Sequence, residues 1–406
     1  MITDAHCRFS HYAGKRLHLG VCGSVAAFRA PDLLRWWRQA RIDVSVTLTP
    51  SARRFIAPLT FEALGASPVY TDMFAPGDTF AHLEPGQIAQ AMVIAPASAA
   101  TLARLAQGQA DEMLACQALA FDGPLVVAPA MNPRMWAHPA TRATMATLAA
   151  RGTTVVSPDR GGTACGDQGE GRLADLRRIH LAGLRALSPR DMAGLRGMIT
   201  LGPTREDWDA VRFWSNPSTG TMGASLAVAA WLRGASVTAI CGPGCPWLPE
   251  DIVRRDVRSA REMFAAAEEL WPSMDVGMFT AAVADFSPEP FGAEKFKKAD
   301  AADGFSVRFL PNPDILKTLA ARRASHQKVL GFAAETAADL PAAVRAKRAA
   351  KGADLLVGNP VGREGAGFAA DTNTVVVADA AGREEQWPSL PKPDVAWRIC
   401  SWLLEL

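Results

Sequence analysis

The 406-residue sequence lacks the features that mark membrane, secreted and nucleic-acid-binding proteins. Its longest apolar runs, such as residues 91–97 and 124–130, fall well short of the roughly 18 residues that suggest a membrane-spanning helix. Residues 1–16 contain no apolar stretch, so we expect no secretory signal there. Lys and Arg number 43 against 41 Asp and Glu, with no long basic block. We therefore expect a cytoplasmic protein whose partners include neither a membrane nor a nucleic acid.

Several common site patterns are missing as well. The seven cysteines form an odd, scattered set, which favours reduced thiols over a disulfide framework. Cys241 and Cys245 lie four residues apart, but no second Cys or His pair nearby completes a zinc site, and metal ligands stay unassigned. No G-x-G-x-x-G follows a predicted strand, which argues against a nicotinamide-dependent dehydrogenase, and no lysine completes a P-loop.

What the sequence does contain is two loosely similar segments, residues 17–49 and 198–243. Each has the pattern of a strand, a glycine-containing turn, an amphipathic helix and a second β-branched strand. The composition, 49% hydrophobic and 21% charged, suits packed domains, and the length predicts two or three of them. We expect an α/β protein with two doubly wound, Rossmann-like domains, mainly parallel sheets, and a linker at residues 187–197.

Strand-like and helix-like stretches alternate along both halves, and ligands of such folds bind beyond the carboxyl ends of the strands. Further strands are expected at residues 92–95, 125–128, 153–157, 276–283, 328–332 and 354–357, and helix-like stretches around 98–119 and 133–150. The predicted divisions are a disordered leader at 1–15, a first domain at 16–190 and a second at 191–406.

Polar motifs of the first half fall in the expected loops. Gly20-Val-Cys-Gly23-Ser24 opens a helix after a strand, where backbone N–H groups can cradle a phosphate, although tight βα packing accounts for the same glycines. Ser98 follows the next central strand and is expected to face the same crevice. Asn132 lies in PAMNPRMW just past a buried strand, Cys165 lies in the glycine-rich ACGDQGEGR, and His82 lies in FAHLE.

In this order the motifs resemble the flavin-dependent cysteine decarboxylases, in particular the phosphopantothenoylcysteine decarboxylases, over residues 15–186. The resemblance implies a flavodoxin-like domain that binds FMN through Gly23, Ser24, Thr49 and Ser98. It implies oxidation of the thiol-bearing carbon, loss of CO2 to give an enethiol, and return of a hydride from the flavin. It also implies that His82 is the base in the oxidation, Asn132 grips the substrate carboxylate, and Cys165 donates a proton.

The second half has a long predicted loop that carries ITLGPTRE (199–206) and VRFWSNPSTGTMG (211–223). Its small hydroxyl residues and glycines suit phosphate contacts at a helix N-terminus. Asp285 ends the strand of AAVADF, and KFKK (295–298) supplies three lysines shortly afterwards. A solvated basic stretch and a triphosphate-binding cluster both account for KFKK.

These blocks, with NPDIL (312–316), GFAAET (331–336) and KRAAKGADLLVGN (347–359), resemble the phosphopantothenate–cysteine ligases over residues 198–405. Such ligases are fused to the decarboxylase in bifunctional bacterial proteins of coenzyme A synthesis. The resemblance implies three small-molecule substrates, 4'-phosphopantothenate, L-cysteine and CTP with Mg2+, and an acyl-cytidylate intermediate. It also implies a homo-oligomer.

The same resemblance assigns roles to single residues of the second half. Lys295 is the cation that neutralises charge at the reacting phosphate, and Arg212 and Asn216 handle phosphopantothenate and the acyl-cytidylate. The implied CTP contacts are Thr280, Ala281, Asp285, Lys295, Pro313, Asp314, Ile315, Leu316, Phe332, Lys347 and Lys351.

The second half departs from the ligase pattern at three positions. Thr221 replaces a lysine, Pro217 stands where a histidine is common, and Pro360 follows Asn359 where an aspartate is usual. We still expect an active ligase, because Lys295, Asn216 and Asp285 are intact. Alternatives are a regulatory flavoprotein without chemistry, a flavin prenyltransferase and a peptidyl-cysteine decarboxylase. The flap cysteine argues against the first, and the others leave the second half unexplained.

Overall fold

The computed structural model describes residues 4–74, 79–162, 166–297, 304–336, 338–360 and 370–406. It divides into two compact units, one containing residues 10–188 and the other containing residues 4–9 and 189–406. The division between Ser188 and Pro189 lies two residues from the predicted boundary at residue 190. Within the described ranges, no helix is both long and apolar enough to cross a membrane.

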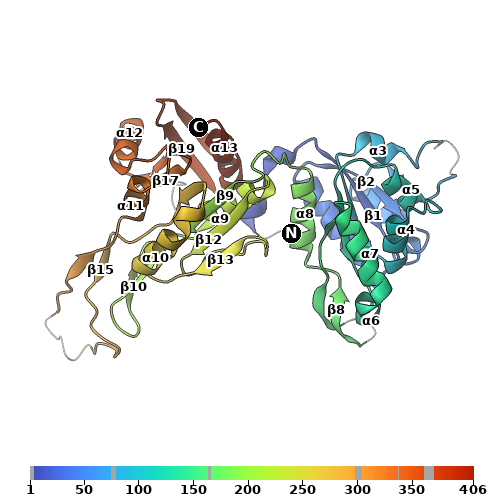
Figure 1. The fold of residues 1–406 in the computed structure, drawn as a ribbon, viewed down its shortest axis with the longest axis horizontal. Helices are drawn as coiled ribbons and strands as arrows, with labels where there is room; N and C mark the ends of the chain where they lie inside the picture. The colour runs from blue at the N-terminus through green and yellow to red at the C-terminus, as the bar shows by residue number, and fades with distance from the viewer. Residues whose placement is uncertain (1–3, 75–78, 163–165, 298–303, 337, 361–369) are drawn as a thin grey trace. The chain divides into compact units, whose positions relative to one another are not determined.

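The first unit is built on a six-stranded sheet with the order β3-β2-β1-β4-β5-β6, and all its pairings are parallel. Helix α1 packs against α8, and α4 packs against α5 and α7. Figure 1 shows α8 on one side of β1 and β2, with α4 and α5 on the other. The sheet strands are β1 Arg16–Val21, β2 Asp43–Leu48, β3 Val69–Tyr70, β4 Ala91–Ala97, β5 Leu125–Pro129 and β6 Thr154–Val155. The helices are α1 Ala30–Gln39, α2 Pro58–Ala63, α3 Glu84–Ile88, α4 Ala99–Gln107, α5 Met113–Leu119, α6 Pro133–Ala137, α7 Pro139–Ala150 and α8 Leu176–Ala186.

Two expected helical stretches of the first unit are each broken into two helices. The stretch at 98–119 breaks at Gly108, whose φ of 70° is the left-handed conformation that ends helices. The stretch at 133–150 breaks at His138, because Pro139 disfavours helical backbone in the residue before it and starts α7 itself. A two-stranded hairpin, β7 Asp159–Gly162 and β8 Gln168–Arg172, was not predicted.

The second unit is built on an eight-stranded sheet with the order β13-β12-β9-β14-β17-β18-β19-β20. It is parallel as far as β18, and β19 and β20 add an antiparallel edge that sequence analysis missed. The strands are β9 Arg196–Leu201, β12 Ser236–Cys241, β13 Val253–Asp256, β14 Val276–Phe279, β17 Lys328–Glu335, β18 Leu355–Pro360, β19 Thr372–Asp379 and β20 Glu384–Pro391. The helices are α9 Thr221–Leu232, α10 Ala260–Leu270, α11 Ile315–Ala321, α12 Leu340–Lys351 and α13 Lys392–Leu404. These two sheets confirm the predicted doubly wound α/β fold.

Four short strands form a separate part of the second unit, which we call the arm. They are β10 Arg205–Asp207, β11 Phe213–Ser215, β15 Phe286–Pro288 and β16 Phe309–Pro311. They pair as β10 with β11 and β15 with β16, and Figure 1 shows β10 and β15 projecting from the end of that unit. The strand predicted at 276–283 ends at Phe279, because the chain then leaves the sheet toward the arm.

The N-terminal segment corrects the predicted disordered leader. Residues 4–9 belong to the second unit, and the 3₁₀ turn Ala5–Cys7 contacts α9 and α13. Phe9 is 2% exposed, and its ring lies edge-on to that of Trp397 with the centroids 5.9 Å apart. The His6 Nε2 atom lies 2.7 Å from the carbonyl oxygen of Trp247. The prediction of disorder was wrong for residues 4–15, because a few apolar residues in a short polar stretch give no periodic signal.

We predict that Phe9→Ala lowers the free energy of unfolding of the second unit by about 3 kcal/mol, since a large buried ring is lost and its cavity remains. Hydrogen–deuterium exchange of α9 and α13 in the full chain measures this. Arg8→Ala is the control, because Arg8 is exposed beside it. Equal exchange in the Phe9 and Arg8 variants would show that residues 4–9 are only loosely attached.

Candidate functional site

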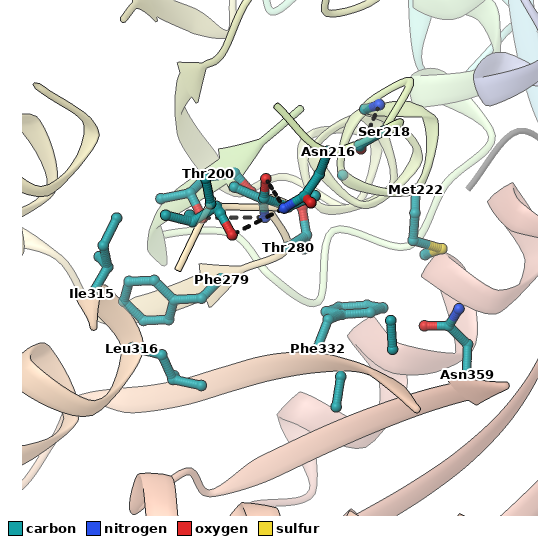
Figure 2. A pocket seen from close by; sticks show the side chains of 18 of the residues that line it. Thr200, Asn216, Ser218, Met222, Phe279, Thr280, Ile315, Leu316, Phe332 and Asn359 are labelled. Carbon is teal, nitrogen blue, oxygen red and sulfur yellow. Dashed lines mark hydrogen bonds between the residues drawn. The ribbon is translucent and has the colours of Figure 1, made fainter. Parts of the chain in front are cut away.

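The second unit contains a pocket of about 430 Å³ at the carboxyl ends of its central strands. Strand order reverses between β9 and β14, which is where ligands of doubly wound folds bind. Figure 2 shows Phe279, Ile315 and Leu316 gathered at one end of this pocket, and Met222 and Asn359 at the other. The predicted residues that line it are Asn216, Thr280, Ala281, Asp285, Pro313, Asp314, Ile315, Leu316, Phe332, Lys347 and Lys351. Their contact with a nucleotide stays a prediction.

The pocket wall after β14 is an extended segment, residues 280–285, held by hydrogen bonds from several neighbours. The Thr280 hydroxyl donates to the carbonyl of Thr200 over 2.7 Å. The Asn216 side-chain amide donates to the carbonyls of Ala282 and Val283 over 3.2 and 3.1 Å (Figure 2). The Asn312 amide donates to the carbonyl of Ala284 over 2.8 Å. Asn216 therefore shapes the wall in addition to any contact with substrate.

Helix α9 begins directly against this wall. A Cβ atom on Gly223 would lie 2.3 Å from the Thr280 hydroxyl oxygen and 2.5 Å from the Leu201 Cβ, so only glycine allows the first turn to approach so closely. The loop Ser218–Thr221 that precedes and opens the helix lines the pocket. Backbone N–H groups at such a helix start favour anions.

Two predicted lysines line the pocket as members of ion pairs. The Lys347 Nζ lies 2.8 Å from a Glu335 carboxylate oxygen, and Lys351 pairs with Asp314. Both lysines belong to α12, one helical turn apart, as the sequence predicts. A triphosphate would compete with these carboxylates for the two ammonium groups.

Lys295 and Arg212 are not among the residues that line the pocket. Lys295 is exposed between β15 and β16. Arg212 lies in the arm region, where it donates to the Asp209 carboxylate over 2.7 Å and to the carbonyl of Phe296 over 3.2 Å. Burial alone would raise the pKa of Asp209, but hydrogen bonds from the backbone N–H groups of residues 211, 212 and 296 lower it. The carboxylate therefore stays charged and pairs with Arg212.

In the first unit, the expected FMN residues lie in the loops after neighbouring strands β1, β2 and β4. Ser24, Thr49 and Ser98 each accept a hydrogen bond from a backbone N–H, over 3.2, 3.1 and 3.3 Å respectively. A Cβ atom on Gly23 would lie 2.4 Å from that of Ser51, so only glycine brings these two loops together.

A flavin phosphate fits this place chemically. The Ser24 and Thr49 hydroxyls, which accept from the backbone, each have a proton of their own to donate, whereas the Ser98 hydroxyl donates to that of Thr101 over 3.2 Å. The strand order reverses between β1 and β4. Val25 and Phe28, just after the loop, are 56% and 63% exposed and offer apolar surface for a ring system. The residues present therefore fit FMN.

His82 lies half-buried in the turn before α3, in a loop anchored from the sheet. The Thr47 hydroxyl of β2 donates to the buried Gln117 of α5 over 2.7 Å. The Gln117 amide in turn donates over 2.9 Å to the carbonyl of Ala81, the residue before His82. Sequence analysis missed this support, because a lone glutamine in an apolar helix carries no motif.

Buried histidines elsewhere in this unit are poor bases. Burial lowers the pKa of His18 in β1 and of His180 in α8 to about 3, so both are neutral near pH 7. Burial likewise raises the pKa of the Cys22 thiol after β1, despite its hydrogen bond to Thr101. Unlike these two buried histidines, His82 is only half-buried.

Asn132 caps the short helix α6 and contacts the β7–β8 hairpin. Its amide nitrogen donates to the Asp167 carboxylate over 2.6 Å, and its oxygen accepts from the Arg134 N–H over 2.8 Å. Gly171 of β8 has a φ of 148°, and a Cβ there would lie 2.4 Å from the Met131 carbonyl oxygen. A substrate carboxylate bound by Asn132 would have to displace Asp167. Cys165 lies outside the described residues, two positions before Asp167.

Cys241 ends β12, and Cys245 follows in the next loop. In the part of the chain that the structure describes, no group of three or more His, Cys, Asp or Glu side chains gathers in a way that could hold a metal ion. A hydrogen bond between the two thiols lowers the pKa of Cys241 and raises that of Cys245. The Cys245 sulfur lies 3.3 Å from the carbonyl oxygen of Leu201.

Two family models match the chain in tandem. The flavoprotein model matches residues 8–182, and the model of the DNA/pantothenate metabolism flavoprotein C-terminal domain matches residues 192–406. The chain is 39% identical over 367 residues to the coenzyme A biosynthesis bifunctional protein CoaBC of Escherichia coli (strain K12), covering 89% of this chain and 90% of that protein. The chain belongs to the CoaBC family.

A second full-length relative agrees with this membership. The CoaBC protein of Bacillus subtilis (strain 168) is 39% identical over 387 residues, covering 94% of both chains. A solved structure of the C-terminal domain of a CoaBC protein is 31% identical, with a TM-score of 0.45, and covers 53% of this chain and 97% of that one. The decarboxylase-like first half and the ligase-like second half therefore both belong to one family of bifunctional proteins.

We predict that Gln117→Leu loosens the loop that carries His82, because Thr47 and Ala81 lose their hydrogen-bond partner inside the unit. Hydrogen–deuterium exchange over residues 79–88 should become faster, and the free energy of unfolding should fall by about 2 kcal/mol. Gln107→Leu is the control, since Gln107 is exposed at the end of α4. Unchanged exchange over 79–88 would show that Gln117 does not support the loop.

Proposed function

We propose that this chain carries out two consecutive steps of coenzyme A biosynthesis. The second unit joins L-cysteine to 4'-phosphopantothenate at the expense of CTP. The first unit then decarboxylates phosphopantothenoylcysteine to 4'-phosphopantetheine with FMN. The observation that carries the proposal is the tandem match of both family models, each on a unit with polar residues at its own strand-order reversal.

In the ligation, a carboxylate oxygen of 4'-phosphopantothenate bonds to the α-phosphorus of CTP while the bond to pyrophosphate breaks. The amine of cysteine then attacks the acyl carbon, and CMP leaves. Lys347 and Lys351 line the pocket and suit the negative charge of a triphosphate. Phe332 and Leu316 supply apolar surface for the nucleotide base. Asn216 and Asp285 complete the substrate side of the pocket in this assignment.

Lys295 is assigned the neutralising role at the reacting phosphate, which requires its segment to approach the pocket. Its neighbour Phe296 is held in the arm region, where the Phe296 N–H donates to Asp209 over 3.1 Å. Arg212 contacts both of these groups, so it positions the segment and is available to the acyl-cytidylate only when the segment moves. These roles rest on the sequence motif. They are supported by the contacts of Arg212 with Asp209 and with Phe296, the neighbour of Lys295.

Mg2+ is expected to arrive with the nucleotide. Magnesium keeps several waters and is usually held by one or two carboxylates together with substrate phosphates. Asp285 and Asp314 are carboxylates of the pocket and suit this arrangement. Asp285 and Asp314 are the protein carboxylates that this proposal offers to Mg2+.

In the decarboxylation, FMN supplies the hydride chemistry when bound. His82 acts as the base while the thiol-bearing carbon of the substrate is oxidised, and it lies half-buried in the turn before α3. Asn132 holds the departing carboxylate through neutral donors, since a full cation would stabilise the ground state against loss of CO2. Cys165 returns a proton to carbon at the end of the sequence.

We also propose that the protein is a cytoplasmic homo-oligomer. Exposed apolar side chains of the arm, among them Trp214, Phe286 and Phe309, provide surface that a second copy could cover.

The test supplies phosphopantothenate, cysteine and CTP to the purified full chain and follows products by mass spectrometry. We expect CTP-dependent formation of phosphopantothenoylcysteine and its conversion to 4'-phosphopantetheine, with a yellow protein that carries FMN. Accumulation of phosphopantothenoylcysteine alone would contradict the decarboxylase assignment. Absence of both products, in a protein reconstituted with FMN, would contradict both assignments and favour a binding role.

A further inference from the structure

Cys241 and Cys245 form a pair of thiols beside the pocket of the second unit, and neither proposed reaction uses them. Cys241 is the last residue of β12 and is buried, whereas Cys245 is half-buried in the loop that follows. Both thiols are free. Two neighbouring thiols, one of them accessible from solvent, are the arrangement that forms a reversible disulfide.

The fold brings both sulfur atoms to the end of β9. In the sheet, Cys241 lies opposite Leu201, the last residue of β9. The Leu201 carbonyl oxygen accepts from the N–H of Gly242 over 2.9 Å, and the Cys245 sulfur lies 3.3 Å from the same oxygen. The loop therefore folds back over the strand end and places Cys245 beside Cys241. A hydrogen bond between the thiols lowers the pKa of Cys241, although burial acts against it.

Arg254 of β13 brings positive charge close to the pair. Its guanidinium group donates over 3.1 Å to the carbonyl of Pro246, the residue after Cys245, and its charge favours the thiolate form of Cys241. The Asp256 carboxylate, to which Arg254 donates over 2.8 Å, acts in the opposite direction. Because the thiolate is the form that oxidants attack, a cation beside a partly exposed thiol is typical of redox-active cysteines.

The Cys245 sulfur also lies between two loops at the pocket. A Cβ atom on Gly202, in the loop after β9, would lie 2.4 Å from this sulfur. A Cβ atom on Gly220, the residue that precedes α9, would lie 3.3 Å from it. Gly220 lines the pocket. The position of the Cys245 sulfur therefore determines how closely the loop after β9 and the loop before α9 pack together.

Formation of a disulfide would move Cys245 more than Cys241. A covalent bond between two sulfur atoms is shorter than a hydrogen bond between two thiols, so the sulfurs have to approach each other. Cys241 is held in β12, which pairs with β9 on one side and β13 on the other. Cys245 follows Gly244, which has a φ of 78° and no atom close to the position of a Cβ. The bond therefore draws the Cys245 sulfur away from Gly202 and Gly220.

We propose that a hydroperoxide converts Cys241 and Cys245 to a reversible disulfide, and that this disulfide slows the ligation. The Cys245 sulfur attacks one peroxide oxygen, the O–O bond breaks, and the departing alkoxide takes up the thiol proton, which leaves a sulfenic acid. The Cys241 sulfur then attacks that of Cys245, and the hydroxyl group leaves as water with the Cys241 proton. Two thiols and one hydroperoxide thus give one disulfide, one alcohol and one water. The effect on ligation rests on the proposed function, whereas the disulfide does not.

The experiment treats the purified full chain with hydrogen peroxide and afterwards with a phosphine reductant. It compares the wild type with Cys245→Ser and Cys241→Ala, each of which removes one thiol, so that a folding defect in one variant leaves the other to decide. Cys116→Ser is the matched control, because Cys116 is a half-buried cysteine of α5 in the first unit. Pyrophosphate release from CTP and phosphopantothenate is measured in a single turnover without L-cysteine, since this thiol substrate would reduce the disulfide.

Mass spectrometry of the tryptic peptide 234–254, which contains both cysteines, should show the loss of two hydrogen atoms in the oxidised wild type and Cys116→Ser chains. Hydrogen–deuterium exchange over residues 216–223 should become faster. The rate of pyrophosphate release should fall at least about tenfold, because a displacement of about 1 Å in a site can cost on the order of a hundredfold in rate. The reductant should reverse all three changes. Cys245→Ser and Cys241→Ala should keep their own exchange and rate in peroxide.

Three results would overturn the proposal. The first is a wild-type peptide 234–254 that keeps both thiols in peroxide. The second is a disulfide that leaves exchange over residues 216–223 and the rate of pyrophosphate release unchanged. The third is an equal loss of rate in peroxide for the variants at Cys241 and Cys245, which would place the sensitive thiol elsewhere. If the reduced wild type releases no pyrophosphate, the proposed ligation fails, while the mass and exchange measurements still decide whether this pair controls the loop before α9.

Discussion

The reversal of strand order beside the first strand of each sheet is the constraint on which both sites depend. In the first unit β1 lies between β2 and β4, and in the second β9 lies between β12 and β14. Chain connections leave such a pair of strands toward opposite faces, so their loops separate and a crevice opens at the carboxyl ends. The residues with candidate chemistry in each unit follow these strands or the strands beside them.

In each unit, glycines allow neighbouring backbone segments to pack closely and so form the wall of the crevice. Gly223 lets the first turn of α9 lie against Thr280 and Leu201, and Gly23 lets the loop after β1 meet the loop after β2. Hydrogen bonds then hold the loops, as those from Asn216 hold the segment after β14. Lys347 and Lys351 of α12 then bring positive charge to the pocket of the second unit.

The α/β fold class could be predicted, and most of the residues predicted to contact CTP line the pocket of the second unit, because strand periodicity and short motifs are local signals. The role of Gln117 could not be predicted, since it acts through Thr47 and Ala81, which lie far away in the chain and are brought near only by the folded sheet. The antiparallel strands β19 and β20 break the alternation of strand and helix on which the strand predictions rested, and they were missed although Gly382, with a φ of 95°, marks the turn between them. Residues 4–9 were assigned to a disordered leader because their contacts with α9, α13 and Trp247 join parts of the chain that lie far apart in the sequence.

The central claim is that one chain carries two separable reactions, one in each unit. The most direct measurement follows pyrophosphate release from CTP and CO2 release from supplied phosphopantothenoylcysteine in the Lys295→Gln variant of the full chain. The account predicts that pyrophosphate release is lost while CO2 release continues at the wild-type rate. Loss of both activities, or pyrophosphate release at the wild-type rate, would contradict it.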